Sequence, residues 1–340
     1  MNLTNLSKYR SELMGIAMLM VVFHHLPFEI NNPIFHYVKQ NAGFGVDIFL
    51  LLSGIGLYYS ISKENTTLLD YYLHRAIRIF PIYALVILAV SIIKGNFNVV
   101  AYLLKVSTIG WWTTGECYDW FIPTIVMLYA IFPVFYHFIL RQNGKKTGMW
   151  GGYLSVAIIY LTIIVFVPYN SDFQMLLRFP VFFLGTVFGK LIKEQPAMCS
   201  NRFFTFILLI MFVFGLSLSI YAFIFCNAPC GFTEIPEIKK TGWLFVPYVF
   251  MVPFFCLSLC SVFCLKTTSL MCRLLKNVGI MSIEVYLLHS QFINLTRYWT
   301  NEYGWSKPLV GGVMVILCFI VSWYVHKLNN WITNMIRGAI

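Results

Sequence analysis

Long hydrophobic runs, each about 18–25 residues, follow one another along the chain and are separated by short polar segments. A run of this length can cross the ~30 Å hydrocarbon core of a bilayer as an α-helix. Strands of a membrane barrel would alternate apolar and polar residues, and these runs do not alternate. The pattern therefore predicts an all-α, polytopic transmembrane helix bundle.

We expect about ten spans in this bundle, which would place both termini on the same side of the membrane. Because most loops are short, successive helices are expected to be antiparallel neighbours. Residues 1–340 are predicted to form a single integral-membrane domain, since no polar linker or internal repeat is evident. The spans are expected near 11–28, 43–61, 79–93, 119–140, 149–167, 176–193, 203–225, 243–265, 278–297 and 308–328.

Two of the longer connections affect the later argument. Residues 62–78 are expected to form a cytoplasmic loop, with Pro81 starting or kinking the third span. Residues 94–118 are expected outside the membrane, and the short apolar segment 97–113 within them would lie along the interface or dip into it.

Composition excludes a soluble protein. The chain is 59% hydrophobic and 11% charged, whereas soluble domains carry roughly 25% charged residues. The net charge of +11 indicates orientation rather than nucleic-acid binding, because most Lys and Arg residues fall on the side of the amino terminus. The positive-inside rule then places both termini in the cytoplasm and predicts a multi-pass protein of the plasma (inner) membrane.

Ionisable residues inside two neighbouring runs are the first candidates for chemistry. His24 and His25 end the first span, and Asp47 lies near the start of the second. A charge at the bilayer centre costs at least ~2.5 kcal/mol, and such residues usually mark function. If the two spans form a hairpin, His25 and Asp47 both lie ~5 Å inside the outer boundary. A carboxylate–imidazole hydrogen bond would then prepare the histidine as a general base.

The same residues also permit a structural interpretation, in which they make a polar contact near the interface. His24 and His25 are about 100° apart on a helix, so only one can point squarely at the second span. The choice between them stays open.

Further polar residues suggest two other sites. Arg75 and Arg78 share one helix face at i, i+3, which suits bidentate phosphate binding or contact with lipid headgroups. Glu284 and His289 lie within the predicted ninth span and form either an internal polar site or a structural contact. No Walker, Rossmann or zinc motif is present, and Ser53 has no nucleophile-elbow sequence around it.

These segments, in this order, resemble the acyltransferase 3 family of multi-span membrane proteins. The first span ends in His, as in the family, and GVDIFLLLSG (45–54) is similar to its G-V-D-x-F-F-x-L-S-G. RAIRIFPIY (75–83) resembles its R-x-x-R-x-x-P-x-Y, and Trp120, Tyr129 and Pro133 keep the spacing of its fourth-span motif. RFPVFFLG (178–185) and GIMSIEVYLLH (279–289) resemble two later signatures, so the likeness covers almost the whole chain.

Two positions depart from the family pattern. Members commonly have an arginine eleven residues before the first-span histidine, where this chain has Met14 or Leu13. Arg10, one helical turn nearer the amino terminus, could serve instead. Many members also carry a glutamate five residues after the tryptophan of the fourth-span motif, and here that position is Ile125.

The resemblance implies an O-acyltransferase that takes acetyl from cytoplasmic acetyl-CoA and transfers it to a hydroxyl of an extracytoplasmic carbohydrate. It implies no bound cofactor or metal. His25 or His24 with Asp47 would be catalytic, and Arg75, Arg78 and His74 would bind the CoA phosphates. The residues expected to support the site or bind substrate are Arg10, Trp120, Tyr129, Arg178, Glu284 and His289.

The acceptor is not identified by these motifs. Outer-loop residues Trp111, Trp112, Glu116 and Asp119 could stack on and hydrogen-bond to a sugar, but they suit many glycans. The acyl group could be larger than acetyl, and transfer could be direct or proceed through an acyl-enzyme. The oligomeric state is unreadable from the sequence. The rival classes are a transporter of a glycan or lipid-linked substrate, which would show internal pseudo-symmetry, and a non-catalytic relative.

Overall fold

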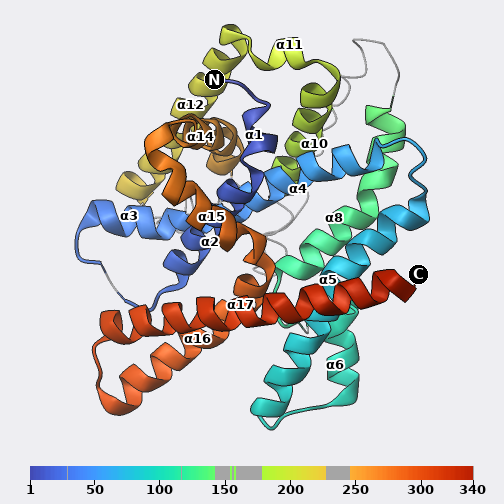
Figure 1. Cartoon of the computed structure of the whole chain (residues 1–340). Helices are drawn as coiled ribbons and strands as arrows, with labels where there is room; N and C mark the ends of the chain where they lie inside the picture. Colours follow the sequence, from blue (N-terminus) through green and yellow to red (C-terminus); the bar gives the residue numbers. More distant parts are fainter. Residues whose placement is uncertain are drawn as a thin grey trace. The chain divides into compact units, whose positions relative to one another are not determined.

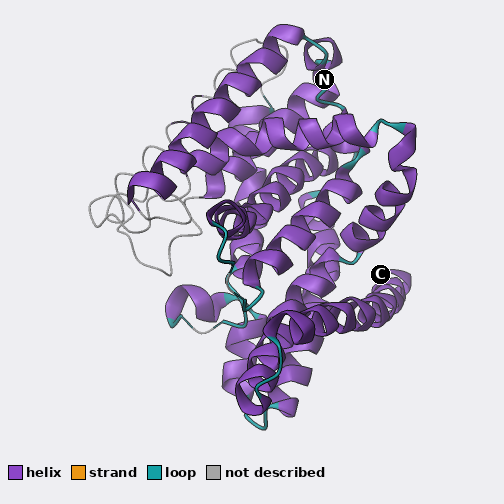
Figure 2. Ribbon diagram, turned by 90° about the vertical axis from the view of Figure 1, so that its left-hand side faces the viewer, coloured by secondary structure: helices purple, strands orange, loops and turns teal. Residues whose placement is uncertain are grey.

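The computed structural model describes residues 1–28, 30–115, 117–141, 154, 157, 178–226 and 246–339. This described part of the chain is built from helices and contains no strand (Figure 2). The all-α prediction is therefore confirmed. Five of the described helices are long and apolar enough to cross a membrane, namely Pro33–Ile61, Leu68–Ile93, Phe121–Leu140, Arg202–Tyr221 and Lys307–Gly338.

The membrane class agrees with these lengths, while the total of about ten spans and the orientation of the termini stay predictions. Pro247–Phe263 is a shorter apolar helix. The predicted span at 149–167 lies outside the described residues, apart from two isolated helical positions.

Contacts divide the chain into two compact units. Unit 1 comprises Met1–His24, Ile30–Glu64 and Ile131–Ile280, and unit 2 comprises His25–Glu29, Asn65–Ala130 and Met281–Ile340. The boundary crosses helix α2 (Arg10–His25) between its two histidines. The candidate residues are thereby divided, and each unit is described by itself. A single functional domain stays a prediction.

In unit 1, α2 runs antiparallel to α4 (Gly45–Ile61), as the hairpin prediction requires. At one end the ring of His24 lies beside Gly43, and at the other the guanidinium of Arg10 lies beside Gly56. The 3₁₀ turn η1 (Ala42–Phe44) leads into α4.

Helix α10 (Phe179–Glu194) runs parallel to α4 and packs closely along it in unit 1 (Figure 1). The approach depends on two glycines. A Cβ at Gly54 would collide with the carbonyl oxygen of Phe182, and one at Gly185 with the carbonyl oxygen of Leu51. Small residues of this kind let helix backbones approach in a membrane, where no hydrophobic force drives helices together. We call this close contact at Gly54 and Gly185 the α4–α10 seam. It keeps the amino ends of the two helices next to each other.

The other helices of unit 1 surround this pair. Helix α12 (Arg202–Cys226) packs antiparallel to α14 (Val246–Phe263), with Phe212 against Phe254 and Phe214 against Phe250. The shorter elements are α1 (Asn5–Lys8), α3 (Pro33–Asn41), the π-helical η2 (Tyr136–Leu140), α11 (Pro196–Cys199), η5 (Lys266–Thr268) and α15 (Ser269–Ile280).

Unit 2 is built around α5 (Leu68–Ile93), α16 (Ser282–Tyr303) and α17 (Lys307–Ala339). Helices α16 and α17 form an antiparallel hairpin that turns at Gly304, whose φ of +66° suits glycine. The pair is drawn in orange and red in Figure 1. Helix α8 (Phe121–Phe135) begins in unit 2 and passes into unit 1.

One prediction about the connections needs correction, and another segment gains detail. The loop predicted at 62–78 ends by Thr67, because Thr67 and Asp70 form a capping box that starts α5 at Leu68. Pro81 consequently lies inside the helix, so it does not start the third span, and its predicted role as a kink stays a prediction. The segment 97–113 forms two short helices, α6 (Val99–Val106) and α7 (Ile109–Thr113).

Candidate functional site

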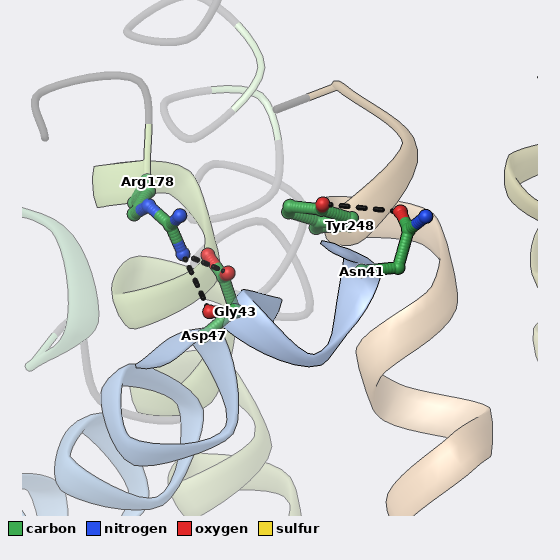
Figure 3. A network of polar contacts seen from close by, with 5 residues as sticks. All are labelled: Asn41, Gly43, Asp47, Arg178 and Tyr248. Carbon is green, nitrogen blue, oxygen red and sulfur yellow. Dashed lines mark hydrogen bonds and ion pairs between the residues drawn. The ribbon is translucent and has the colours of Figure 1, made fainter. Parts of the chain in front are cut away.

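Asp47 forms a buried ion pair with Arg178 in unit 1 (Figure 3). Asp47 lies in the first turn of α4, where the helix dipole favours a carboxylate, and it is fully buried. Arg178 directly precedes α10, and its Nη1 donates to Asp47 Oδ2 and, at 3.5 Å, to the carbonyl oxygen of Gly43. Because α4 and α10 are parallel, the pair joins their amino ends.

A second set of contacts fixes the segment that leads into α4. The Tyr248 hydroxyl donates to Asn41 Oδ1 at 3.2 Å (Figure 3). The Ser219 hydroxyl donates to the same oxygen at 3.2 Å. The guanidinium carbon of Arg178 lies 5.8 Å from the centre of the Tyr248 ring, within cation–π range. Residues 41–47 are thus held from two sides by buried polar contacts.

The partner of Asp47 corrects one prediction. The carboxylate was expected to pair with an imidazole, but in unit 1 its ionic partner is Arg178. His24 Nδ1 instead lies 3.1 Å from the carbonyl oxygen of Lys39. A carbonyl only accepts hydrogen bonds, so this contact places the proton of neutral His24 on Nδ1 and the lone pair on Nε2. The main chain, rather than Asp47, therefore sets the His24 tautomer.

In unit 2, His25 packs against His289. Their ring centres are 5.1 Å apart and their planes are tilted by 70°. His25 is exposed, whereas His289 is 6% exposed and its Nδ1 contacts the carbonyl oxygen of Tyr286. The sequence singled out both histidines but did not predict that they would meet.

Polar and aromatic residues continue from this histidine pair along α16. The Tyr286 ring lies 5.3 Å from His289 and 5.1 Å from Phe121. Next to Phe121, Asp119 Oδ1 accepts a hydrogen bond of 2.8 Å from the main-chain N–H of Ile122, which caps α8. Tyr286 was absent from the predicted site, because a tyrosine in an apolar run gives no signal of function by itself.

Glu284 forms a separate buried cluster between α16 and α17. Its Oε1 accepts from Asn329 Nδ2 at 2.7 Å and lies 3.1 Å from His326 Nδ1. Glu284 is fully buried and Asn329 nearly so. Both partners are on α17, so Glu284 and His289 belong to different sets of contacts despite their proximity in sequence.

The paired arginines of α5 have different environments. Arg75 donates to the carbonyl oxygen of Tyr71 at 2.9 Å, and its guanidinium carbon lies 4.1 Å from the centre of the Tyr71 ring. The Tyr71 hydroxyl in turn donates to the carbonyl oxygen of Tyr129 at 3.1 Å. Arg78 and His74 are exposed on the same helix.

The remaining predicted residues have mainly structural contacts. Arg10 Nε donates to the carbonyl oxygen of Leu52 at 3.3 Å, which places Arg10 at the opposite end of α2 from His24. Trp120 contacts Phe121 edge to face, with ring centres 6.0 Å apart. Met14 and Ile125, which replace family residues, are buried apolar residues.

Within the described ranges, no group of three or more His, Cys, Asp or Glu side chains is arranged to hold a metal ion. A family model described as an acyltransferase domain matches residues 13–327. The match spans both units and covers every candidate residue except Arg10. Neither the curated proteins nor the solved structures give a match.

Proposed function

Since the chain belongs to the acyltransferase 3 family, we propose that it moves acetyl from cytoplasmic acetyl-CoA to a hydroxyl of an extracytoplasmic sugar or polysaccharide. The observation that carries the proposal is the contact between exposed His25 and buried His289. An exposed imidazole held against a buried one is accessible to an acceptor and has a defined orientation. This is the requirement for a general base.

In this proposal, His25 removes the proton of the acceptor hydroxyl as its oxygen attacks the thioester carbonyl. The C–S bond breaks, the acceptor becomes an acetate ester, and the proton finally resides on the CoA thiol. His24 is the alternative base, because its contact with the Lys39 carbonyl leaves the lone pair on Nε2. Asp47 contributes by pairing with Arg178 and fixing the entry to α4.

The donor phosphates are assigned to α5. Arg78 and His74 are exposed, and Arg75 is held by Tyr71 with its charge on the same helix face. Guanidinium groups suit phosphate because their planar donors match its oxygens in pairs. Arg78 is therefore the principal phosphate contact, and Arg75 and His74 complete the site.

The base assignment is tested in proteoliposomes loaded with labelled acetyl-CoA. The acceptor probe is cell-surface polysaccharide from the native host, freed of ester groups by mild alkali. His25→Ala should lower the transfer rate at least 100-fold, since general bases typically contribute 10²–10⁴-fold. His36→Ala, on α3, is the matched control and should retain the rate. Undiminished transfer by both His24→Ala and His25→Ala would remove histidine from the base role.

The donor site is tested by the KM for acetyl-CoA. Arg78→Ala should raise it about tenfold, which corresponds to about 1.4 kcal/mol of lost binding, with a smaller effect on kcat. Arg202→Ala, an exposed arginine on α12, is the control. An unchanged KM in the Arg75→Ala, Arg78→Ala double variant would contradict the donor site. Glycan transport without acyl transfer by the wild type would contradict the proposed function itself.

A further inference from the structure

A buried polar cluster in unit 2 lies beside the histidine pair and belongs neither to the proposed base nor to the proposed donor site. Its members are Asp119, which precedes α8, Tyr83 of α5 and Tyr286 of α16. The hydroxyls of Tyr83 and Tyr286 lie close enough to the Asp119 carboxyl to affect its ionisation. Tyr286 also contacts His289, which contacts His25. The cluster is therefore continuous with the proposed base.

Two buried atoms of this cluster are not held by regular hydrogen bonds. Asp119 Oδ2 and the Tyr83 hydroxyl are buried, and neither makes a hydrogen bond of regular geometry with any described residue. Tyr83 as a whole is 0% exposed. Buried polar atoms are nearly always satisfied, so each exception needs an explanation. An acceptor oxygen and a hydroxyl donor that face each other without a regular hydrogen bond between them match the hydrogen-bonding groups of a polyol.

The charge of Asp119 is also uncompensated in the part of the chain that the structure describes. Its contacts are tyrosine hydroxyls and the main-chain N–H groups of Phe121 and Ile122, with no Lys or Arg ion pair. Burial raises the pKa of Asp119 to about 7, although these hydrogen-bonding groups act in the opposite direction. A buried carboxyl without a cationic partner destabilises the fold when it is ionised. Such destabilising groups are typically retained for function.

We propose that Asp119 and Tyr83 form the subsite that binds two hydroxyl groups of the sugar acceptor and presents a third to His25. Asp119 Oδ2 accepts a hydrogen bond from one sugar hydroxyl, and the Tyr83 hydroxyl donates to the next. The rings of Tyr286 and Phe121 line the same region and suit the apolar face of a sugar. A carboxylate repels anions, so the acceptor residue is a neutral sugar rather than a uronic acid or a phosphorylated sugar. This inference rests on the proposed function.

The test measures the KM for the polysaccharide probe and, separately, the KM for acetyl-CoA. Asp119→Asn keeps an Oδ1 that can cap Ile122, removes the charge and replaces the Oδ2 acceptor with an amide donor. It should raise the polysaccharide KM at least tenfold and leave the acetyl-CoA KM within twofold. Tyr83→Phe should raise the polysaccharide KM about fivefold. Tyr102→Phe, which removes a hydroxyl from α6 in the same unit, is the matched control and should have no effect.

Thermal unfolding separates binding from a structural role. Only the wild type buries an ionised carboxyl at pH 8, so Asp119→Asn should melt at the same or a higher temperature there. The difference should be smaller at pH 5, where the folded protein holds Asp119 protonated. The titratable groups facing Asp119 are Tyr83, Tyr286 and Tyr118, which stay neutral in this range. His25 and His289, beyond Tyr286, are common to both proteins.

The outcomes distinguish this inference from the proposed function. If the wild type transfers acetyl but the polysaccharide KM of both variants stays within twofold, the subsite is wrong and the function stands. If Asp119→Asn melts earlier at both pH values without a change in KM, Asp119 is only a helix cap. If the wild type transfers nothing, the proposed function fails first.

Discussion

Asp47 and Asp119 are two buried carboxylates near helix amino ends, and they are treated oppositely by their surroundings. Asp47 faces a guanidinium, so its charge is compensated across the α4–α10 seam. Asp119 faces tyrosine hydroxyls and main-chain N–H groups. Each carboxylate has one buried oxygen without a regular hydrogen bond, so the difference between them is the cation that Asp47 faces and Asp119 does not. We infer from this difference that Asp47 supports the fold and that Asp119 serves the proposed acceptor subsite.

Removing the cation from Asp47 is expected to have the largest effect. Arg178→Ala would strand a buried carboxylate, and breaking such a pair typically costs 3–5 kcal/mol. The purified protein in detergent should show this loss in urea unfolding monitored by circular dichroism. Asp47→Asn should be similarly harmful, because it strands the arginine.

The double variant Asp47→Asn, Arg178→Gln tests whether the two charges act as a pair. Neutral, hydrogen-bonding side chains at both positions should be milder than either single change. If the two losses of unfolding free energy simply add in the double variant, the residues act independently. Asp47 would then not differ from Asp119 by having a compensating partner.

The second prediction concerns the seam that keeps Asp47 and Arg178 level. Gly185→Ala places a methyl group against the carbonyl oxygen of Leu51 and should cost about 1–3 kcal/mol, because packed helices must separate. Gly312→Ala on α17 is the control, since a Cβ there meets no atom within 4 Å. It should be neutral or stabilise by up to about 1 kcal/mol. Equal behaviour of the two variants would contradict the close approach.

Glu284 is a third buried carboxylate, and its surroundings are intermediate between those of Asp47 and those of Asp119. Glutamine at this position keeps an oxygen for Asn329 Nδ2 and adds donors, so Glu284→Gln should cost about 1 kcal/mol, as for one ordinary hydrogen bond. The measurement is the loss of unfolding free energy in urea, compared with the loss for Arg178→Ala. A loss as large as that of Arg178→Ala would mean that His326 is protonated and forms an ion pair with Glu284.

The sequence predicts the features of this fold that depend on local pattern. Apolar runs of membrane length identify helices, and short loops predict the antiparallel arrangement of α2 and α4. The start of α5 was also accessible, because Thr67 and Asp70 have the spacing of a capping box. Hydropathy instead predicted the start of this helix near residue 79. The charged side chains on the first turns of α5 lower the local hydropathy, so these turns were assigned to the preceding loop.

Partnerships over long sequence separations were not predictable. Counting residues from the span ends predicted that Asp47 and a histidine lie at the same depth in the membrane. It gave no information on the sixth predicted span, which supplies Arg178. Glu284 similarly finds its partners on α17, more than forty residues away. The exposure of His25 and the burial of His289 also depend on neighbouring helices, which periodicity in a uniformly apolar segment does not reveal.

The glycine seam has a consequence for the evolutionary record. Gly54 and Gly185 each touch a main-chain carbonyl of the other helix, and no substitution can alter a carbonyl. A larger residue at either glycine therefore has no compensating change across the contact. Neither position can vary in step with its neighbour, so among homologues that keep this seam, methods that infer proximity from correlated substitutions would find little signal where the two helices are closest.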